Sequence, residues 1–261
     1  MKNSKIAIIG GGSMGSALAN GLFDSGFDAA GLCVANPHTD KLKGLAARGI
    51  RVTDNNVEAI KGADIVIIAV KPWVLPEVAA QLKAHLDYGT QKVGLIVAGI
   101  SGDELRAMFD KDGTLPVLVQ MMPNTAMSVG CSMTFAVALN GSAEDIAAIF
   151  RPTGSVMIIE ERLLPAATAL ASCGIAYALR YVRAAVEGGV ELGFRAADAQ
   201  AIVTATLQGA AALLAQPGAH AESEIDKVTT PGGLTIRGLN AMEDKGFTPA
   251  VIAGLKASVK S

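Results

Sequence analysis

The sequence predicts an α/β protein: an N-terminal, doubly wound and mostly parallel sheet, followed by a second, all-α domain. Two observations predict it. Up to about residue 160, short and continuously apolar runs alternate with helical stretches, as in strands buried on both faces. After residue 163 such runs stop, and only long helical stretches rich in Ala and Gly follow. The length of 261 residues accommodates two domains, so we expect one over 1–160 and the other over 161–261.

The predicted strands are the apolar runs of the first part. The later runs lie close together along the chain, so we expect some of them to pair antiparallel at one edge of the sheet. The runs cover residues 5–9, 32–35, 65–70, 93–98, 117–121, 133–137 and 156–159.

The second part predicts helices over 163–192, with a weak point near Gly174, and over 196–216. A third helix is expected to begin at Thr230-Pro231, and a last one at Thr248-Pro249, running to residue 259. Thr followed by Pro is typical of a helix start, because the hydroxyl caps free N–H groups and proline suits the first helical position.

Composition excludes several classes of function. The net charge is −2, from 22 basic and 24 acidic residues, which provides no sequence-wide basic field for nucleic acid or for an anionic membrane. The longest apolar run of the first half, 65–70, is far shorter than the roughly 18 residues of a membrane span. Three widely spaced cysteines indicate neither a disulfide framework nor a metal site. We therefore expect a cytoplasmic protein without nucleic-acid or membrane partners.

The first chemical motif is Gly10-Gly11-Gly12-Ser13-Met14-Gly15, which fits G-x-G-x-x-G. It directly follows an apolar strand and opens an amphipathic helix, the context that supports a dinucleotide site. Gly10 makes the tight turn, Gly12 lets the backbone approach a pyrophosphate, and Gly15 lets helix and strand pack. The N–H groups at Ser13 and Met14 face the phosphates at the positive end of the helix dipole. The motif predicts a Rossmann-type domain that binds a dinucleotide cofactor.

The end of the second strand indicates which dinucleotide is used. A site that prefers NAD places Asp or Glu there, on the ribose 2′-hydroxyl. This chain has Asn36, followed by His38, Thr39 and Lys41. A neutral amide with a hydroxyl and basic groups nearby suits a 2′-phosphate, although Asp40 weakens the basic character. We therefore expect NADPH as the cofactor, with NADH as the alternative.

Three further motifs follow predicted strands, and a fourth lies in the helical part. The carboxyl ends of parallel strands border the ligand crevice, so the first three belong to the cofactor side. The motifs are Ala69-Val70-Lys71-Pro72, Ala98-Gly99-Ile100, Met122-Pro123-Asn124-Thr125 and Val228-Thr229-Thr230-Pro231-Gly232-Gly233-Leu234-Thr235-Ile236.

Together with the glycine-rich turn, these motifs resemble pyrroline-5-carboxylate reductases along the whole chain and in the same order. The segment T-P-G-G-x-T-I is the most specific part. The resemblance implies hydride transfer from NADPH to the C=N bond of Δ1-pyrroline-5-carboxylate, which gives L-proline in the last step of its biosynthesis. It implies that Thr235 hydrogen-bonds the ring nitrogen. A threonine N-cap at Thr230 and the free N–H groups near Gly232, Gly233 and Leu234 suit the substrate carboxylate.

The resemblance also extends the cofactor site. Asn56 matches an asparagine that reaches the adenosine half, although a turn residue in Asp54-Asn55-Asn56 explains it equally well. The V-K-P backbone is implied to lie near the nicotinamide ribose, and Asn124 is a candidate for orienting the nicotinamide end. The expected contacts outside the glycine-rich turn are Asn36, Asn56, Ala69, Val70, Lys71, Pro72, Ala98, Gly99 and Asn124.

The sequence also departs from the family pattern. The family reads G-S-G-P-A-Y where this chain has Ser172-Cys173-Gly174-Ile175-Ala176-Tyr177, and Arg183 and Ala205 replace an acidic residue and a glutamine. These changes leave the exact imine substrate open. The resemblance further implies dimers formed through the helical domain, in some members assembled into decamers.

Three other functions remain as alternatives. One is an imine reductase with another substrate. A second is a β-hydroxyacid dehydrogenase-like enzyme, but Arg180 and Arg183 stand where such enzymes need a G-x-x-x-K lysine in the first long helix. The third is a non-catalytic, NADPH-binding regulatory protein.

Overall fold

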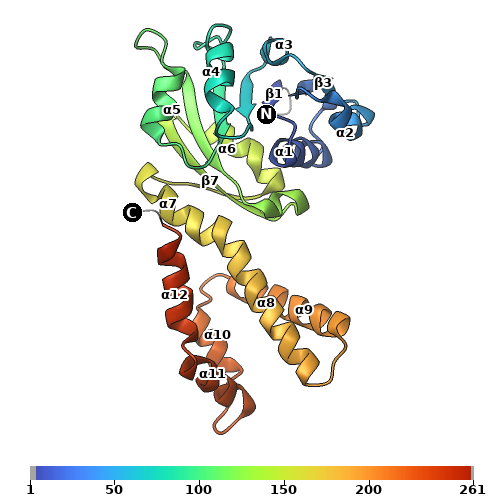
Figure 1. The fold of residues 1–261 in the computed structure, drawn as a ribbon, viewed down its shortest axis with the longest axis vertical. Helices are drawn as coiled ribbons and strands as arrows, with labels where there is room; N and C mark the ends of the chain where they lie inside the picture. Colours follow the sequence, from blue (N-terminus) through green and yellow to red (C-terminus); the bar gives the residue numbers. More distant parts are fainter. Residues whose placement is uncertain (1–3, 260–261) are drawn as a thin grey trace. The chain divides into compact units, whose positions relative to one another are not determined.

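The computed structural model describes residues 4–259 and confirms the α/β sheet and the helical second part (Figure 1). One eight-stranded sheet has the order β3-β2-β1-β4-β5-β6-β7-β8. Among the strands of residues 4–259, only β6 and β7 pair antiparallel within this sheet, and the other neighbours are parallel. The strands are β1 (Ile6–Ile9), β2 (Leu32–Ala35), β3 (Arg51–Thr53), β4 (Ile65–Ile68), β5 (Lys92–Ile96), β6 (Val117–Met122), β7 (Ser132–Asn140) and β8 (Gly154–Ile158).

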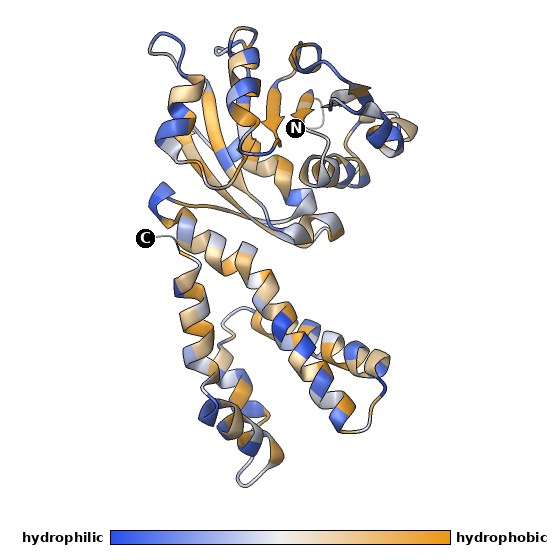
Figure 2. Ribbon diagram, viewed as in Figure 1, coloured by the Kyte–Doolittle hydropathy of each residue, from blue (hydrophilic) through white to orange (hydrophobic). Residues whose placement is uncertain are grey.

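Helices cover both faces of the sheet, which explains the continuous apolarity of its strands (Figure 2). In β1, Ala7 and Ile9 belong to one buried apolar cluster, which includes residues of the helices at 56–60, 75–83 and 102–109. Ile6 and Ile8 belong to a second cluster, which includes residues of the helices at 13–24, 43–47 and 144–150. All four of these side chains are buried, as expected for a doubly wound sheet. The helices are α1 (Ser13–Asp24), α2 (Lys43–Ala47), α3 (Asn56–Ile60), α4 (Leu75–Lys83), α5 (Gly102–Phe109) and α6 (Glu144–Phe150).

The remaining helices carry the chain to its C-terminal part. The chain divides into two compact units, Met1–Ser172 and Cys173–Ser261, whereas the boundary expected from the sequence falls after residue 160. The expected weak point near Gly174 coincides with the end of a π-helical segment. The elements are α7 (Leu164–Ala167), the π-helical η6 (Thr168–Cys173), α8 (Gly174–Glu191), α9 (Ala196–Leu214), α10 (Ala221–Lys227), α11 (Leu234–Asp244) and α12 (Phe247–Ala257).

Both helices expected near the Thr-Pro pairs are present, but neither threonine is the N-cap of its helix. Thr230 does not cap α11; instead its carbonyl accepts a hydrogen bond from Gly233 N at 2.9 Å, which closes a turn before the helix, and Gly233 is the N-cap. Gly232 adopts φ 70° in this turn, a conformation that glycine tolerates readily. α12 begins before Thr248, because Gly246, at φ 80°, reverses the chain directly after α11. Local glycine geometry therefore outweighed the Thr-Pro signal.

The helices of the second unit carry many exposed apolar side chains. Leu179 and Leu192 are exposed, and an apolar groove between α8 and α12 is lined by residues that include Tyr181, Met242 and Phe247. By length and composition alone, the helical stretch Glu161–Glu191 could also cross a membrane, whereas we expected no membrane partner from the sequence. Apolar surface on this scale is typical of an interface that another chain covers.

Candidate cofactor and substrate sites

The glycine-rich turn lies where the strand order of the sheet reverses, between β1 and β4. Gly10 N donates to Ala35 O at 2.8 Å, and Ala69 N donates to Ile9 O at 2.7 Å. Gly10 adopts φ 103°, and a Cβ on it would lie 2.6 Å from Ala69 O. Only glycine allows this close approach. The ends of β1 and β4 therefore form the crevice in which open α/β sheets bind ligands.

The other two glycines of the motif have different surroundings. A Cβ on Gly15 would lie 2.0 Å from Gly10 O, so Gly15 lets α1 pack against the turn. Gly12 is the N-cap of α1, and apart from its chain neighbours no described residue comes within 4 Å of a Cβ built on it. This open space, in front of the free N–H groups of the helix, suits a pyrophosphate. The residues present therefore fit a bound dinucleotide.

Asn36 lies beside this turn at the end of β2. Its backbone N donates to Thr53 O at 3.0 Å, and its side-chain Nδ2 donates to His38 O at 3.0 Å. A Cβ on Gly11 would approach Asn36 Cβ to 3.3 Å. Asn36 thus occupies the place from which a side chain reaches the adenosine ribose, and its preference for a 2′-phosphate stays a prediction.

The loop after β5 is held by a buried side chain that we did not predict from the sequence. Gln120 of β6 is 1% exposed, and its Nε2 donates to Val97 O at 3.2 Å and to Ile100 O at 3.3 Å. These carbonyls flank Ala98 and Gly99, both predicted to contact the cofactor. In the sequence, this support is indicated by a single feature, the polar amide of Gln120 within the otherwise apolar strand 117–122.

Two predicted cofactor residues make contacts within the protein. Asn124 is 6% exposed; its Oδ1 accepts from Ala126 N at 3.1 Å, and its Nδ2 donates to Ala171 O at 3.2 Å. Asn56 Nδ2 donates to Gln81 Oε1 at 2.9 Å. These hydrogen bonds hold the loop after β6 and join α3 to α4. The predicted contacts of Asn56 and Asn124 with the cofactor remain predictions.

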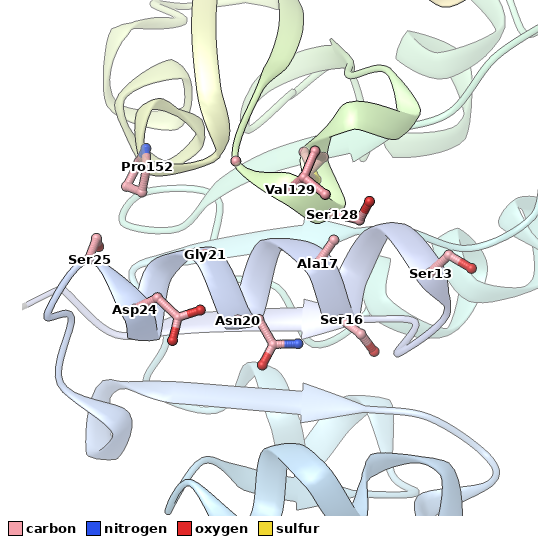
Figure 3. A pocket seen from close by; sticks show the side chains of 12 residues that line it. Ser13, Ser16, Ala17, Asn20, Gly21, Asp24, Ser25, Ser128, Val129 and Pro152 are labelled. Carbon is pink, nitrogen blue, oxygen red and sulfur yellow. The ribbon is translucent and has the colours of Figure 1, made fainter. Parts of the chain in front are cut away.

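A groove of about 640 Å³ runs along α1 from its first residue, Ser13 (Figure 3). It lies between α1 and the turn that carries Ser128 and Val129, with Pro152 at its other end. Of its lining residues, Ser13 was predicted to bind cofactor, and Asp24 carries the one charge. The groove therefore borders the phosphate end of the crevice.

The predicted substrate residues lie together at the start of α11. Gly233 is the N-cap, Leu234 and Thr235 form the first turn, and Thr235 is exposed. The first N–H groups of an α-helix have no partner within the helix, so this helix start can accept an anion. Thr230, also exposed, lies beside it, since its Oγ1 would be 2.4 Å from a Cβ on Gly233. The structure thus brings Thr230, Gly232, Gly233, Leu234 and Thr235 together.

The segment that departs from the family pattern is part of the π-helical turn and of α8. The Ser172 hydroxyl is buried and has no hydrogen-bond partner among the described residues. Tyr177 OH contacts Ser258 Oγ and donates to Gly254 O at 3.2 Å, which joins α8 to α12. Arg183 pairs with Glu187 along α8. The residues that differ from the family pattern therefore belong largely to α8, which also packs against α12 within the second unit.

The crevice and the helix start define a dinucleotide-dependent oxidoreductase with a helical domain. Comparisons with known proteins specify it further. Residues 5–90 match the family described as NADP oxidoreductase coenzyme F420-dependent, and residues 161–261 match pyrroline-5-carboxylate reductase dimerisation. A pyrroline-5-carboxylate reductase 2 of Dictyostelium discoideum is 36% identical, covering 100% of this chain and 93% of that protein. The Synechocystis reductase is 33% identical, covering 98% and 96%. The chain belongs to the pyrroline-5-carboxylate reductase family.

Solved structures agree with this assignment. A pyrroline-5-carboxylate reductase from Coxiella burnetii has a TM-score of 0.92 and 28% identity, covering 98% of this chain and 96% of that one. Plasmodium falciparum pyrroline carboxylate reductase, solved with NADP bound, has a TM-score of 0.85 and 25% identity, covering 99% and 97%. The match of residues 161–261 to a dimerisation domain assigns self-association to the helical part and accounts for its exposed apolar surface.

Proposed function

We propose that this protein reduces Δ1-pyrroline-5-carboxylate to L-proline with NADPH, in the last step of proline biosynthesis. The observation that carries the proposal is the full-length family match. Two helix starts support it, at the glycine-rich turn and at α11, because the first N–H groups of each helix suit an anion. A protein that only sensed NADPH would need the first site alone.

The N-terminal unit holds the cofactor. NADPH supplies the hydride that reduces the C=N carbon. The N–H groups at Ser13 and Met14 bind the pyrophosphate, and Asn36 faces the 2′-phosphate, which an acidic side chain would repel. Gln120 holds the loop that contains Ala98 and Gly99 by its two hydrogen bonds, which presents this backbone to the nicotinamide end. Asn124 positions the neighbouring loop.

The start of α11 holds the substrate. The substrate carboxylate accepts hydrogen bonds from the free N–H groups near Gly233 and Leu234, with Thr230 beside them. The Thr235 hydroxyl donates to the ring nitrogen, which becomes more basic as the C=N bond is reduced and must gain a proton. Because Thr235 is exposed, its hydroxyl is free to rotate toward a ligand.

The oligomer and the compartment are further parts of the proposal. The apolar groove of α8 and α12 is covered by the helices of a second copy. Five such dimers would form the decamer that the family resemblance implies for some members. The free thiols of Cys33, Cys131 and Cys173 are consistent with the reducing cytoplasm.

Steady-state kinetics on purified protein test the function. NADPH oxidation is measured with pyrroline-5-carboxylate and with piperideine-6-carboxylate. NADP reduction is measured with a 3-hydroxyacid. We expect the highest kcat/KM with pyrroline-5-carboxylate. A higher value with the six-membered imine would assign another imine reductase, and turnover of the hydroxyacid alone would assign a dehydrogenase. Tight NADPH binding without turnover of any of them would indicate a regulatory protein.

A further inference from the structure

Trp73 is a large aromatic side chain left in solvent beside the cofactor crevice. It is the one tryptophan of the chain, and it is 76% exposed. Tryptophan is highly buried on average, since its ring has a large apolar area. An indole this exposed next to a ligand crevice is therefore a candidate for burial by the ligand.

The position of Trp73 follows from the end of β4. Val70 borders Gly10 across the crevice, because its Cγ1 would lie 3.1 Å from a Cβ on that glycine. The chain turns helical directly afterwards, since Leu75 N donates to Lys71 O at 3.2 Å. Trp73 thus lies in the first helical turn leading into α4, close to the place where β1 and β4 end.

The helical period indicates which way this turn faces. Leu75, Val78 and Leu82 form the buried face of α4. Trp73, Glu77 and Gln81 are spaced four residues apart and so lie along one exposed flank. Gln81 accepts a hydrogen bond from Asn56 of α3, which shows that this flank faces α3.

The opposite flank of α4 faces another part of the unit. Ala80 and Lys83 line a depression together with Asp110 and Lys111, near the end of α5. Trp73 is therefore on the side of α4 that faces β2 and β3, whose ends carry Asn36 and the start of α3. In doubly wound sheets the adenosine ribose binds at the end of β2.

We propose that Trp73 is a cofactor-contacting residue that packs its indole ring against the adenine ring of bound NADPH. The inference rests on the proposed function, since it requires that the crevice binds this dinucleotide. Every base has a flat π-face that stacks on aromatic side chains and so strengthens binding. Loss of the indole is thus expected to weaken binding about tenfold.

Adenosine 2′,5′-bisphosphate tests the contact without catalysis. It carries the adenine but no nicotinamide, so it does not absorb the emission of tryptophan. Because the chain has one tryptophan, any change in emission reports on Trp73. We expect saturable quenching with the bisphosphate and none with nicotinamide mononucleotide. Calorimetry is expected to give an approximately tenfold higher Kd for Trp73→Ala, with Trp73→Phe much closer to wild type.

Lys83→Ala, on the opposite flank of α4, is the matched control and should leave the Kd unchanged. Because Trp73 is exposed, Trp73→Ala should keep the wild-type Tm. If wild type binds the bisphosphate by calorimetry while its emission stays constant and Trp73→Ala keeps the wild-type Kd, the proposal for Trp73 is refuted and the proposed function stands. If wild type binds neither the bisphosphate nor NADPH, both fail.

Discussion

Alanine at two glycines of the same turn should separate the packing of α1 from the binding of the cofactor. At Gly15, a Cβ would lie 2.0 Å from Gly10 O and 3.2 Å from Ile8 Cγ2. The nearest atom belongs to the backbone, so relief requires α1 to move away from β1. Overpacking of this kind costs about 1–3 kcal/mol, and the backbone clash places Gly15→Ala at the upper end. For a chain of this size, about 3 kcal/mol lowers the Tm by roughly 6–12 °C.

Gly12→Ala should have the opposite profile. Gly12 has φ −75° and ψ −166°, which alanine adopts without strain, and the Cβ would enter open space. The Tm should therefore stay near the wild-type value. The methyl group would occupy the approach to the first N–H groups of α1 and weaken a hydrogen bond to phosphate. Hydrogen bonds to charged groups contribute about 1.5–3 kcal/mol, so the Kd for NADPH should rise about 10- to 100-fold.

Thermal melts by circular dichroism and NADPH titrations would measure both effects. Gly44→Ala is the control, because a Cβ at Gly44 in α2 also meets open space among the described residues but lies outside the turn. It should leave the Kd unchanged and should not lower the Tm, which is expected to rise slightly because alanine is a better helix former than glycine. A Gly12→Ala variant that binds NADPH like wild type, or a Gly15→Ala variant that melts like wild type, would show that the division of roles is wrong.

Four further measurements test the site and its supports. Asn36→Asp places a carboxylate at the expected 2′-phosphate, so kcat/KM should fall with NADPH and hold or rise with NADH; a wild type that prefers NADH would contradict this. Thr235→Ala should lower kcat about 100-fold at an unchanged Tm, and an unchanged kcat would remove this hydroxyl from the mechanism. Gln120→Leu leaves the Val97 and Ile100 carbonyls without their donor, so the free energy of unfolding should fall by about 1–3 kcal/mol and KM for NADPH should rise. An unchanged free energy of unfolding, measured by calorimetry, would show that Gln120 does not support this loop. The Ser101 hydroxyl and N–H donate hydrogen bonds to the Glu104 carboxylate and hold its pKa below the ordinary value of 4.5. The stability that these hydrogen bonds contribute is present above pH 4.5 and is lost on acidification, so the Tm difference between wild type and Ser101→Ala should narrow in acid. A Tm difference that is constant with pH would contradict this.

Most of the sheet could be predicted because its strands are buried on both faces. β4 is continuously apolar, and helices pack on both of its sides. β3 was missed because Arg51–Thr53 is short and half-exposed at the edge of the sheet, where one apolar residue suffices. The antiparallel expectation was confirmed for β6 and β7, whereas β8 pairs parallel to β7. Pairing direction depends on how the connection crosses the sheet, which apolarity alone does not encode.

The residues of the candidate site that stand at the ends of strands could be predicted from the sequence. The buried side chains that hold the loops of the site in place could not. Gly10, Ala69 and Asn36 meet because parallel strands end at one edge of the sheet, a rule that needs only strand positions. Gln120 acts through carbonyls about 20 residues earlier in the chain, and the identity of its partners depends on the register of β5 against β6. A buried amide in an apolar strand must find partners, since leaving it unpaired costs free energy. Such an amide therefore marks a loop that is held in place, and here that loop contains Ala98 and Gly99.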